Sequence, residues 1–293
     1  MTTNQNIPKF VFFGTGDIAR FVLEELVSAK LYPALIVTSQ DMPKGRGLAR
    51  SPSPVGILGE NLAIPLIKTA RIDQTTTAAL KASGCELFVV ADYGALLKTA
   101  VLDIPKHGTL NMHPSLLPRL RGPSPIRSAI LTDESQTGVT IMVLDEEMDH
   151  GPIVAQRRVP ISPWPPRAAA LEEILAREGG KLLCEMIPLW VRKQIEAHPQ
   201  NHDVATYTRK FEKQDGEIRF TDDARTNLLK IMAYEGWPTA YAFFVRDGKR
   251  IRVQLLEAHI EYDELVLDTV KPEGKNAMTF TEFARSGASP ATD

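Results

Sequence analysis

The pattern that most limits the fold lies near the amino end, where an apolar run, a glycine-rich turn and a helical pattern follow one another. Phe10-Val11-Phe12-Phe13 has the apolar character of a buried strand. Gly14-Thr15-Gly16-Asp17-Ile18-Ala19 comes next, and Ile18, Val22 and Leu26 then recur at helical spacing. A strand, a glycine turn and a helix in this order begin a doubly wound α/β fold.

Further apolar runs predict more strands, at Leu35-Ile36-Val37, Leu87-Phe88-Val89-Val90, Gly108 to His113 and Gly138 to Leu144. Pro166 to about Ile195 predicts a long helix. The polar stretch that follows it contains proline and asparagine, as linkers do. We therefore expect a first domain over residues 1–197, a linker over 198–204 and a smaller second domain over 205–293. In the second domain, Asp247-Gly248 predicts the turn of a β-hairpin.

The glycine turn also fits G-x-G-x-x-A, one form of the dinucleotide-binding motif. An NAD-binding dehydrogenase is therefore an alternative of a different class. The second strand weakens this alternative, because it ends at Thr38, where such proteins carry an acidic residue for the ribose.

Composition excludes several classes of protein. The net charge of −2 is not that of a general nucleic-acid binder. Cys85 and Cys184 lie in apolar surroundings and predict buried thiols in a reducing compartment. The cysteine and histidine spacings predict no metal site, and no apolar run has the length of a membrane span. We expect a cytoplasmic protein.

Candidate catalytic residues gather in Asn111-Met112-His113-Pro114-Ser115-Leu116-Leu117-Pro118 and in Met148-Asp149-His150-Gly151. Asn111 and His113 end a predicted strand and point to the same face, because side chains alternate along a strand. An amide can donate to an oxyanion, and an imidazole can accept a proton near neutral pH. We interpret the acidic run Asp145, Glu146 and Glu147 as a solvated turn.

These two segments resemble the signature of the folate-dependent formyltransferases, N-x-H-x-S-L-L-P followed by D-x-G. The resemblance extends from about Phe10 to Phe283. It implies a Rossmann-like formyltransferase domain that uses 10-formyltetrahydrofolate as co-substrate and no metal. It also implies that Asn111, His113 and Asp149 are the catalytic residues.

The resemblance implies a folate site as well. Ala91 to Leu97 is similar to the family's pterin-binding segment, although Asp92 stands where relatives usually have alanine, and Gly16 where they often have proline. The residues expected to contact the folate are Tyr93, Gly94, Ser115, Leu116, Leu117, Pro118 and His150.

Two further elements resemble the branch of the family whose acceptor is initiator methionyl-tRNA, and we expect that partner. One is a basic loop in which Lys44, Arg46 and Arg50 are expected to contact the tRNA. The other is Gly236-Trp237-Pro238 in the second domain, which resembles an OB-like β-barrel, abbreviated between Glu257 and Leu265. We expect a monomer.

Two alternatives use the same donor. One is a formyltransferase that acts on another amine, such as a nucleotide amino-sugar, and the other is a hydrolase of formyltetrahydrofolate. The basic loop and the second domain favour methionyl-tRNA as the acceptor.

Overall fold

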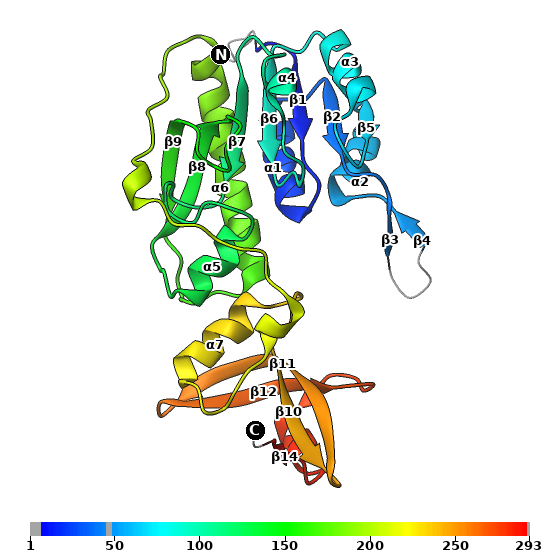
Figure 1. Cartoon of the computed structure of the whole chain (residues 1–293), viewed down its shortest axis with the longest axis vertical. Coiled ribbons are helices and arrows are strands. Elements are labelled where there is room, and N and C mark those ends of the chain that lie inside the picture. The colour runs from blue at the N-terminus through cyan, green and yellow to red at the C-terminus, as the bar shows by residue number, and fades with distance from the viewer. Residues whose placement is uncertain (1–6, 45–48, 292–293) are drawn as a thin grey trace. The chain divides into compact units, whose positions relative to one another are not determined.

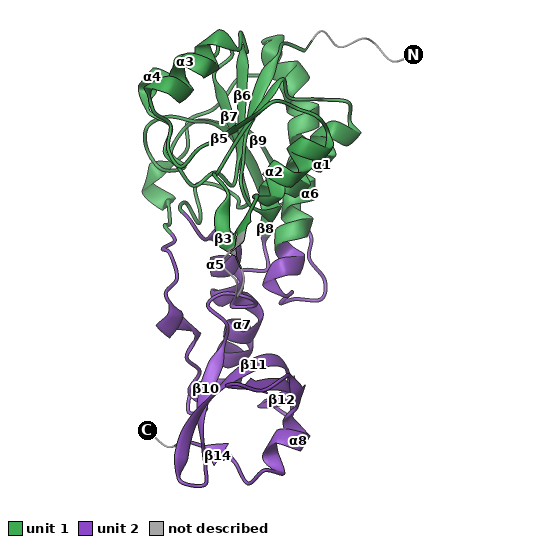
Figure 2. Cartoon of the chain, turned by 90° about the vertical axis from the view of Figure 1, so that its right-hand side faces the viewer, with its two compact units in different colours: residues 1–122, 137–159, 172–207 green, residues 123–136, 160–171, 208–293 purple. Residues whose placement is uncertain are grey.

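The computed structural model describes residues 7–44 and 49–291 and divides the chain into two compact units. Unit 1 comprises residues 1–122, 137–159 and 172–207, and unit 2 comprises residues 123–136, 160–171 and 208–293 (Figure 2). Each unit thus contains segments that are not consecutive in the sequence. The domain boundary at residues 198–204 remains a prediction.

Unit 1 is built on a seven-stranded sheet in the order β5-β2-β1-β6-β7-β8-β9 (Figure 1). The first five of these strands are parallel, and β8 and β9 extend the sheet in antiparallel pairing. This arrangement confirms the predicted Rossmann-like α/β fold. The strands are β1 (Phe10–Phe13), β2 (Leu35–Thr38), β5 (Leu66–Lys68), β6 (Leu87–Ala91), β7 (Thr109–His113), β8 (Thr137–Val143) and β9 (Ile153–Val159).

Helices cover both faces of this sheet. Figure 2 shows α3 and α4 on one face and α1 and α6 on the other. A small hairpin of β3 (Met42–Lys44) and β4 (Ala49–Ser51) stands apart from the main sheet (Figure 1). The helices are α1 (Asp17–Ser28), α2 (Pro54–Asn61), α3 (Gln74–Ala82), α4 (Thr99–Leu102), α6 (Ala168–Val191), whose first turn belongs to unit 2, and the 3₁₀ helix η1 (His202–Val204).

Helix α6 approaches both the sheet and α1 closely because it carries two adjacent glycines. A Cβ at Gly179 would lie 2.6 Å from the side chain of Met112 on β7. A Cβ at Gly180 would lie 2.7 Å from Cβ of Glu25 on α1. These contacts leave no room for larger side chains, so the Gly179-Gly180 pair fixes how α6 backs the strand that carries Asn111 and His113.

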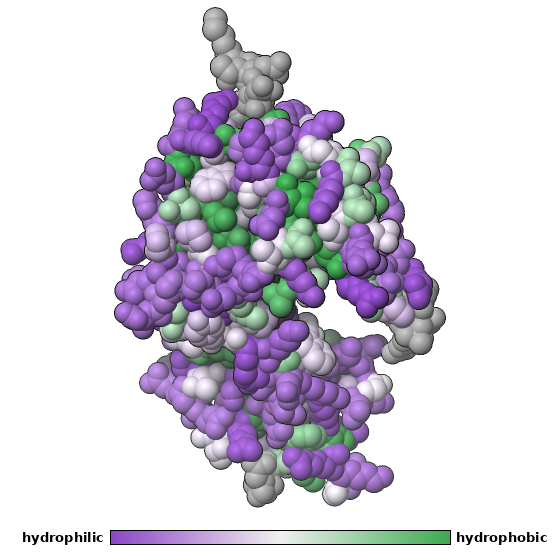
Figure 3. Space-filling model, turned by 45° about the horizontal axis from the view of Figure 1, so that its top comes forward, coloured by the Kyte–Doolittle hydropathy of each residue, from purple (hydrophilic) through white to green (hydrophobic). Residues whose placement is uncertain are grey.

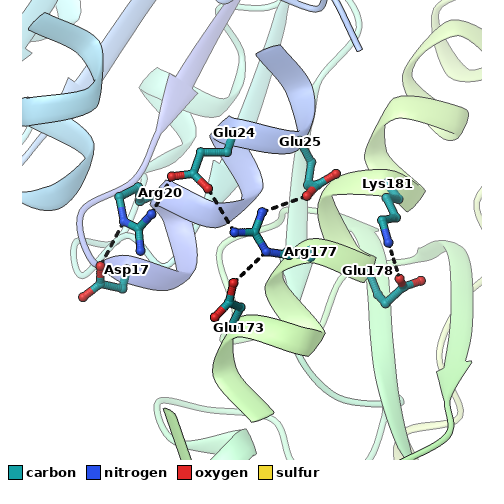
Figure 4. Close-up of polar contacts among 8 residues, drawn as sticks. All are labelled: Asp17, Arg20, Glu24, Glu25, Glu173, Arg177, Glu178 and Lys181. Carbon is teal, nitrogen blue, oxygen red and sulfur yellow. Dashed lines mark hydrogen bonds and ion pairs between the residues drawn. The ribbon is translucent and has the colours of Figure 1, made fainter. Parts of the chain in front are cut away.

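A charged network joins the outer surfaces of α1 and α6 (Figure 4). Arg177 donates to Glu173 at 2.8 Å, to Glu25 at 2.9 Å and to Glu24 at 3.3 Å. Its guanidinium also lies 4.7 Å from the ring centroid of Phe21. One arginine thus links three carboxylates and one ring across the two helices.

Unit 2 contains a five-stranded antiparallel sheet in the order β13-β12-β11-β10-β14. The predicted hairpin is confirmed: Asp247 and Gly248 both have positive φ, as a two-residue turn between β10 and β11 requires. In the described part of the chain, β13 pairs only with β12 and β14 only with β10, so the sheet has two open edges, as expected for an abbreviated barrel. The elements are α5 (Pro125–Leu131), η2 (Lys213–Gly216), α7 (Ala224–Ala233), β10 (Tyr241–Arg246), β11 (Lys249–Glu261), β12 (Glu264–Pro272), β13 (Met278–Thr279), α8 (Phe280–Ala284) and β14 (Ser289–Pro290).

The core of unit 2 lies on one face of this sheet. Phe244 and Val253 are fully buried there, together with Phe283 of α8. On the face of the molecule drawn in Figure 3, hydrophobic residues lie in separate groups among hydrophilic ones. Within the described residues, no helix combines the length and the apolar character that a membrane crossing requires.

The charged network predicts a measurable contribution to stability. We expect Arg177→Ala to lower the free energy of unfolding by about 1 kcal/mol, because it removes several ion pairs and a cation–ring contact from a partly exposed site. Lys181 forms a single pair with Glu178, so the control Lys181→Ala should cost only about 0.3 kcal/mol. Urea unfolding in low salt measures both variants. Equal effects of the two would show that the network adds nothing beyond single pairs.

Candidate active site

Asn111 and His113 lie on β7, two positions apart and therefore on the same face of the sheet. They are buried, with 8% and 5% of their surface exposed. β7 is flanked by β6 and β8, and Pro114 ends the strand because it cannot donate to a ladder. An amide and an imidazole are thus held, largely shielded from water, near the carboxyl end of a central strand. Open α/β sheets bind ligands at such positions.

The ring of His113 has a partner at each nitrogen. Its Nε2 lies 2.9 Å from the backbone carbonyl oxygen of Leu120, and its Nδ1 lies 3.6 Å from Oδ1 of Asp149. A carbonyl can only accept, so we assign the proton of the neutral ring to Nε2. Nδ1 then carries the lone pair. The geometry therefore makes Nδ1 the atom that can accept a proton, with a carboxylate beside it.

Asp149 reaches His113 by a route that the sequence did not indicate. In the sequence, Asp149 follows the strand predicted to end at Leu144, and the sequence does not give the direction of that strand. β8 runs antiparallel to β7, however, and Val143 at its end pairs with Leu110, near the start of β7. The chain after β8 must therefore turn back along the sheet before Asp149 can lie beside His113.

The turn that carries Asp149 is tightly constrained. Asp149 has a φ of 51°, in the left-handed region. Its Oδ2 accepts the backbone N–H of Gly122 at 2.7 Å. A Cβ at Gly151 would lie 1.9 Å from the carbonyl oxygen of Val143, so only glycine fits there. The D-x-G pattern thus has a steric cause: the glycine lets the turn pack on the end of β8.

The acidic run before this turn is not simply solvated. Asp145 Oδ2 lies 2.7 Å from Nδ1 of His150, and its Oδ1 accepts the backbone N–H of Glu147. The predicted solvated turn is confirmed for Glu146 and Glu147, which are exposed, and Asp145 is 37% exposed at its side chain although it also contacts His150. The ring of His150 also stacks on that of His202, with centroids 4.1 Å apart. His150, expected to contact folate, thus already has a carboxylate and a ring as neighbours.

The segment after the catalytic strand is held by its own hydrogen bonds. The hydroxyl of Ser115 donates to the carbonyl of Arg119 at 2.7 Å. Leu117 donates its N–H to Thr140 Oγ1 and accepts from Gln156 Nε2 at 2.7 Å. Ser115 and Leu117 are buried, whereas Leu116 and Pro118 are half-buried. Of the four residues of this segment that are expected at the folate, Leu116 and Pro118 therefore offer more surface to a ligand.

Tyr93 and Gly94, also expected at the folate, follow β6. The ring of Tyr93 packs edge-on against Phe13, with centroids 5.6 Å apart, and burial raises the pKa of its hydroxyl. Gly94 is exposed, and the side chain of Leu96 beyond it is 74% exposed. This loop thus combines a fixed aromatic ring with open apolar surface.

The end of β2 gives no support to the dinucleotide alternative. Thr38 is fully buried, and its hydroxyl lies 2.7 Å from that of Ser53 at the start of α2. At the first turn, a Cβ at Gly14 would lie 2.6 Å from Cβ of Ala19, so Gly14 is required for packing. The glycine motif therefore has a structural explanation without a nucleotide.

Gly16 and Asp92, two departures from the family pattern, lie against each other. The backbone N–H of Gly16 donates to the carboxyl group of Asp92. A Cβ at Gly16 would lie 2.3 Å from Oδ2 of Asp92. A proline at position 16 would supply no N–H. Each residue thus suits the other, because the glycine provides both the donor and the space.

Two of the three residues expected at the tRNA, Lys44 and Arg50, fall on the β3–β4 hairpin. Lys44 ends β3, and Arg50 lies in β4, opposite Pro43, and is exposed. Arg46 lies outside the described residues. The structure therefore shows the two strands that flank the basic loop.

Two buried residues near the site were missed by the sequence analysis. Arg121 is 1% exposed and Gln200 is 5% exposed, and they are hydrogen-bonded to each other. Gln200 falls in the expected linker over residues 198–204. The polar composition of that segment did not predict a buried side chain. Among the described residues, no cluster of three or more histidine, cysteine or acidic side chains is arranged to hold a metal ion.

Comparison with known proteins places this geometry in context. Residues 8–187 match the protein family described as formyl transferase. The chain is 43% identical over 247 residues to the methionyl-tRNA formyltransferase of Chloroflexus aurantiacus, covering 84% of this chain and 78% of that protein. It is 36% identical over 307 residues to the methionyl-tRNA formyltransferase of Thermus thermophilus, covering 97% and 98%.

Solved structures show the same fold at lower identity. The methionyl-tRNA formyltransferase from Clostridium thermocellum superposes with a TM-score of 0.60 at 16% identity, covering 91% of this chain and 99% of that one. A sugar N-formyltransferase from Shewanella sp. superposes with a TM-score of 0.63 at 18% identity, covering 87% and 99%. At these identities the likeness concerns the fold alone.

The Asp92 carboxyl predicts a pH-dependent stability. Although the residue as a whole is exposed, desolvation of its carboxyl group, with smaller contributions from Glu172 and Asp17, raises its pKa to about 6. The folded state therefore holds this proton more tightly than the unfolded state, and stability is lost as pH rises from about 4 to 6. We expect Asp92→Asn to raise the melting temperature at pH 8 and to leave it nearly unchanged below pH 4. An equal effect at every pH, measured by thermal unfolding, would contradict this expectation.

Proposed function

This chain belongs to the formyl transferase family, and we propose that it transfers a formyl group from 10-formyltetrahydrofolate to the amino group of initiator methionyl-tRNA, in support of translation initiation. The observation that carries the proposal is the pairing of His113 with Asp149. His113 lies on β7, the strand that also presents Asn111. The relatives named methionyl-tRNA formyltransferase, one of which aligns with 97% of this chain, support the choice of acceptor.

The reaction is acyl transfer between two nitrogens. The neutral amine of the methionyl group attacks the formyl carbon, and a new C–N bond forms as the carbonyl oxygen takes up negative charge. The bond from that carbon to N10 of the folate then breaks, its electron pair returns to N10, and N10 gains a proton. The protein must stabilise the oxyanion and move one proton, so no covalent acyl-enzyme is needed.

The three site residues match these tasks. The Asn111 amide can donate to the developing oxyanion, a kind of contact that lowers the activation barrier by about 2.7–4 kcal/mol. Nδ1 of His113 can accept the amine proton, because Nε2 is already committed to the carbonyl of Leu120. Asp149, 3.6 Å from Nδ1, stabilises the imidazolium that results. The same proton can then pass to N10.

We place the folate between the loop after β6 and the Asp149 turn. Gly94 and Leu96 offer exposed surface on the first side, and Leu116 and Pro118 offer partly exposed surface on the segment that follows His113. His150 lies at the rim of the turn, 31% exposed at its side chain. Ligand pockets generally have apolar walls and a few polar groups, and these segments supply side chains of both kinds.

We assign the β3–β4 hairpin to the acceptor. Lys44, Arg46 and Arg50 lie within a short segment, and phosphates are neutralised by clustered cations. Arginine also stacks on bases, which suits contact with the single-stranded end of a tRNA.

The outer face of the C-terminal sheet offers a second RNA surface. Arg252 lies 3.7 Å from the ring centroid of Tyr241, and Arg250 lies 3.9 Å from that of Phe243. The opposite face of the same strands is the core that contains Phe244. Tyr241 is only 7% exposed, so the pair that can contact a phosphate and a base together is exposed Arg250 with partly buried Phe243. Acidic residues slightly outnumber basic ones in this part of the chain.

The role of His113 can be tested by His113→Gln. We expect single-turnover formylation of methionyl-tRNA to slow by about 10²–10⁴-fold with the fold retained, because general acid–base groups contribute that much. The control is His107→Gln, which changes a histidine just before the start of β7, away from Asp149. A folded His113→Gln enzyme with normal single-turnover rates would remove His113 from the reaction.

The acceptor surfaces can be tested by the salt dependence of tRNA binding. We expect Arg46→Ala, Arg50→Ala and Arg250→Ala each to weaken binding and to flatten the slope of log affinity against log salt by about 0.7 per lost phosphate contact. The control Lys106→Ala removes an exposed cation on the loop before β7 and should change neither quantity. Folate affinity should be unchanged in all four variants.

The outcomes separate the two surfaces. If the hairpin variants alone change the slope, the C-terminal sheet does not contact the tRNA. If all the variants behave as Lys106→Ala does, the basic hairpin is only a connection and methionyl-tRNA loses its support as the acceptor.

A further inference from the structure

Gln200 spans the turn that carries Asp149. Its Nε2 donates to the backbone carbonyl of Asp149 at 2.9 Å and to that of Gly151 at 2.7 Å. These two carbonyls lie on either side of His150, so one side-chain amide closes the turn from outside. Gln200 is 5% exposed, and water cannot readily replace it there.

Arg121 decides which way this amide points. The Oε1 of Gln200 accepts from Nε of Arg121 at 3.1 Å and from Nη2 of Arg121 at 2.6 Å. A guanidinium has only donors, so the amide oxygen must face Arg121 and the NH₂ group must face the two carbonyls. Arg121 is itself fixed, because it also donates to Tyr207 Oη at 3.1 Å and to His202 Nδ1 at 2.9 Å.

The turn requires such support for two reasons. Asp149 has a left-handed φ of 51°, a backbone conformation that is unfavourable for a residue with a side chain. Its carboxylate must also satisfy two partners, His113 at 3.6 Å through Oδ1 and the N–H of Gly122 at 2.7 Å through Oδ2. A shift of the Asp149 backbone would disturb both contacts together.

We propose that Gln200 is a positioning residue for formyl transfer: oriented by Arg121, it holds the backbone of the Asp149 turn so that the carboxylate stays beside His113. The catalytic part of this inference rests on the proposed function. The structural part does not, because it concerns only contacts within unit 1. Gln200 touches no reacting atom and acts through Asp149.

The test variant is Gln200→Glu. Glutamate has the same shape and still accepts from Arg121, but it has no N–H for the carbonyls of Asp149 and Gly151. The matched control is Asn227→Asp in unit 2. Asn227 is 1% exposed, and its Nδ2 likewise donates to two backbone carbonyls, those of Arg219 and Asp222. Should Gln200→Glu be recovered unfolded, Gln200→Asn, whose amide is one methylene shorter, takes its place.

The first readout is the rate of formyl transfer in a single turnover, with folate and methionyl-tRNA both saturating. We expect Gln200→Glu to slow this step by about 10–100-fold with little change in the KM for folate, because misplacement of a catalytic group by about 1 Å has effects of that size. Asn227→Asp should leave the rate unchanged. In an Asp149→Asn background, Gln200→Glu should add less than about a threefold loss, since residues that act through one another are not additive.

The second readout needs no substrate. The N–H of Gly122 donates to Asp149 Oδ2, so its hydrogen exchange reports whether the carboxylate is in place. We expect exchange at Gly122 to become at least about tenfold faster in Gln200→Glu and to be unchanged in Asn227→Asp.

The outcomes test the positioning role of Gln200 and the proposed formyl transfer separately. Unchanged exchange at Gly122 in a folded Gln200→Glu protein overturns the inference, and so does an equal loss of rate in the wild-type and Asp149→Asn backgrounds. If the wild-type protein itself does not formylate methionyl-tRNA, the proposed function fails, while exchange at Gly122 still decides whether Gln200 positions the turn.

Discussion

The imidazole of His113 is fixed between a backbone carbonyl and a carboxylate, and the surrounding loops keep those two groups in place. The carbonyl of Leu120 arrives on the segment that follows β7, and Thr140 and Gln156 anchor that segment. The carboxylate of Asp149 arrives on the turn that follows β8. Because the carbonyl commits one ring nitrogen as a donor, the other is left as the proton acceptor, and the direction of proton transfer follows from main-chain geometry.

This arrangement places many polar groups away from water, and burial of a polar group is favourable only when its hydrogen bonds are made. Arg121 and Gln200 are both buried beside the site and bond to each other. Their bonds reach the Asp149 turn on one side and the ring of His202 on the other. The polar network therefore specifies one position for the turn, whereas apolar packing alone would tolerate several.

The carboxyl group of Asp92 depends on Gly16 for both space and a hydrogen-bond donor. The family pattern that the sequence resembles implies proline and alanine at these positions, and in this chain Asp92 occupies the space that a side chain at position 16 would need. The N–H of Gly16 satisfies the carboxylate, and the missing Cβ leaves room for it. The turn after β1 and the loop after β6, which leads to the candidate folate site, are thus joined by one hydrogen bond.

The sequence by itself determined the strands of the parallel sheet, the hairpin at Asp247-Gly248 and the family, because apolar runs, turn residues and the N-x-H and D-x-G motifs are local patterns. It also named His113 and Asp149 as candidate site residues, and the structure brings these two side chains within 3.6 Å of each other. Only the tertiary structure decided how Asp149 returns to His113, since that depends on the antiparallel register of β8. Only it showed Asp145 bound to His150, and Gln200 joined to Arg121 across 79 positions of the chain. Contacts between residues so far apart leave no periodic or local pattern, because what creates them is the packing of whole elements and not the preference of any one segment.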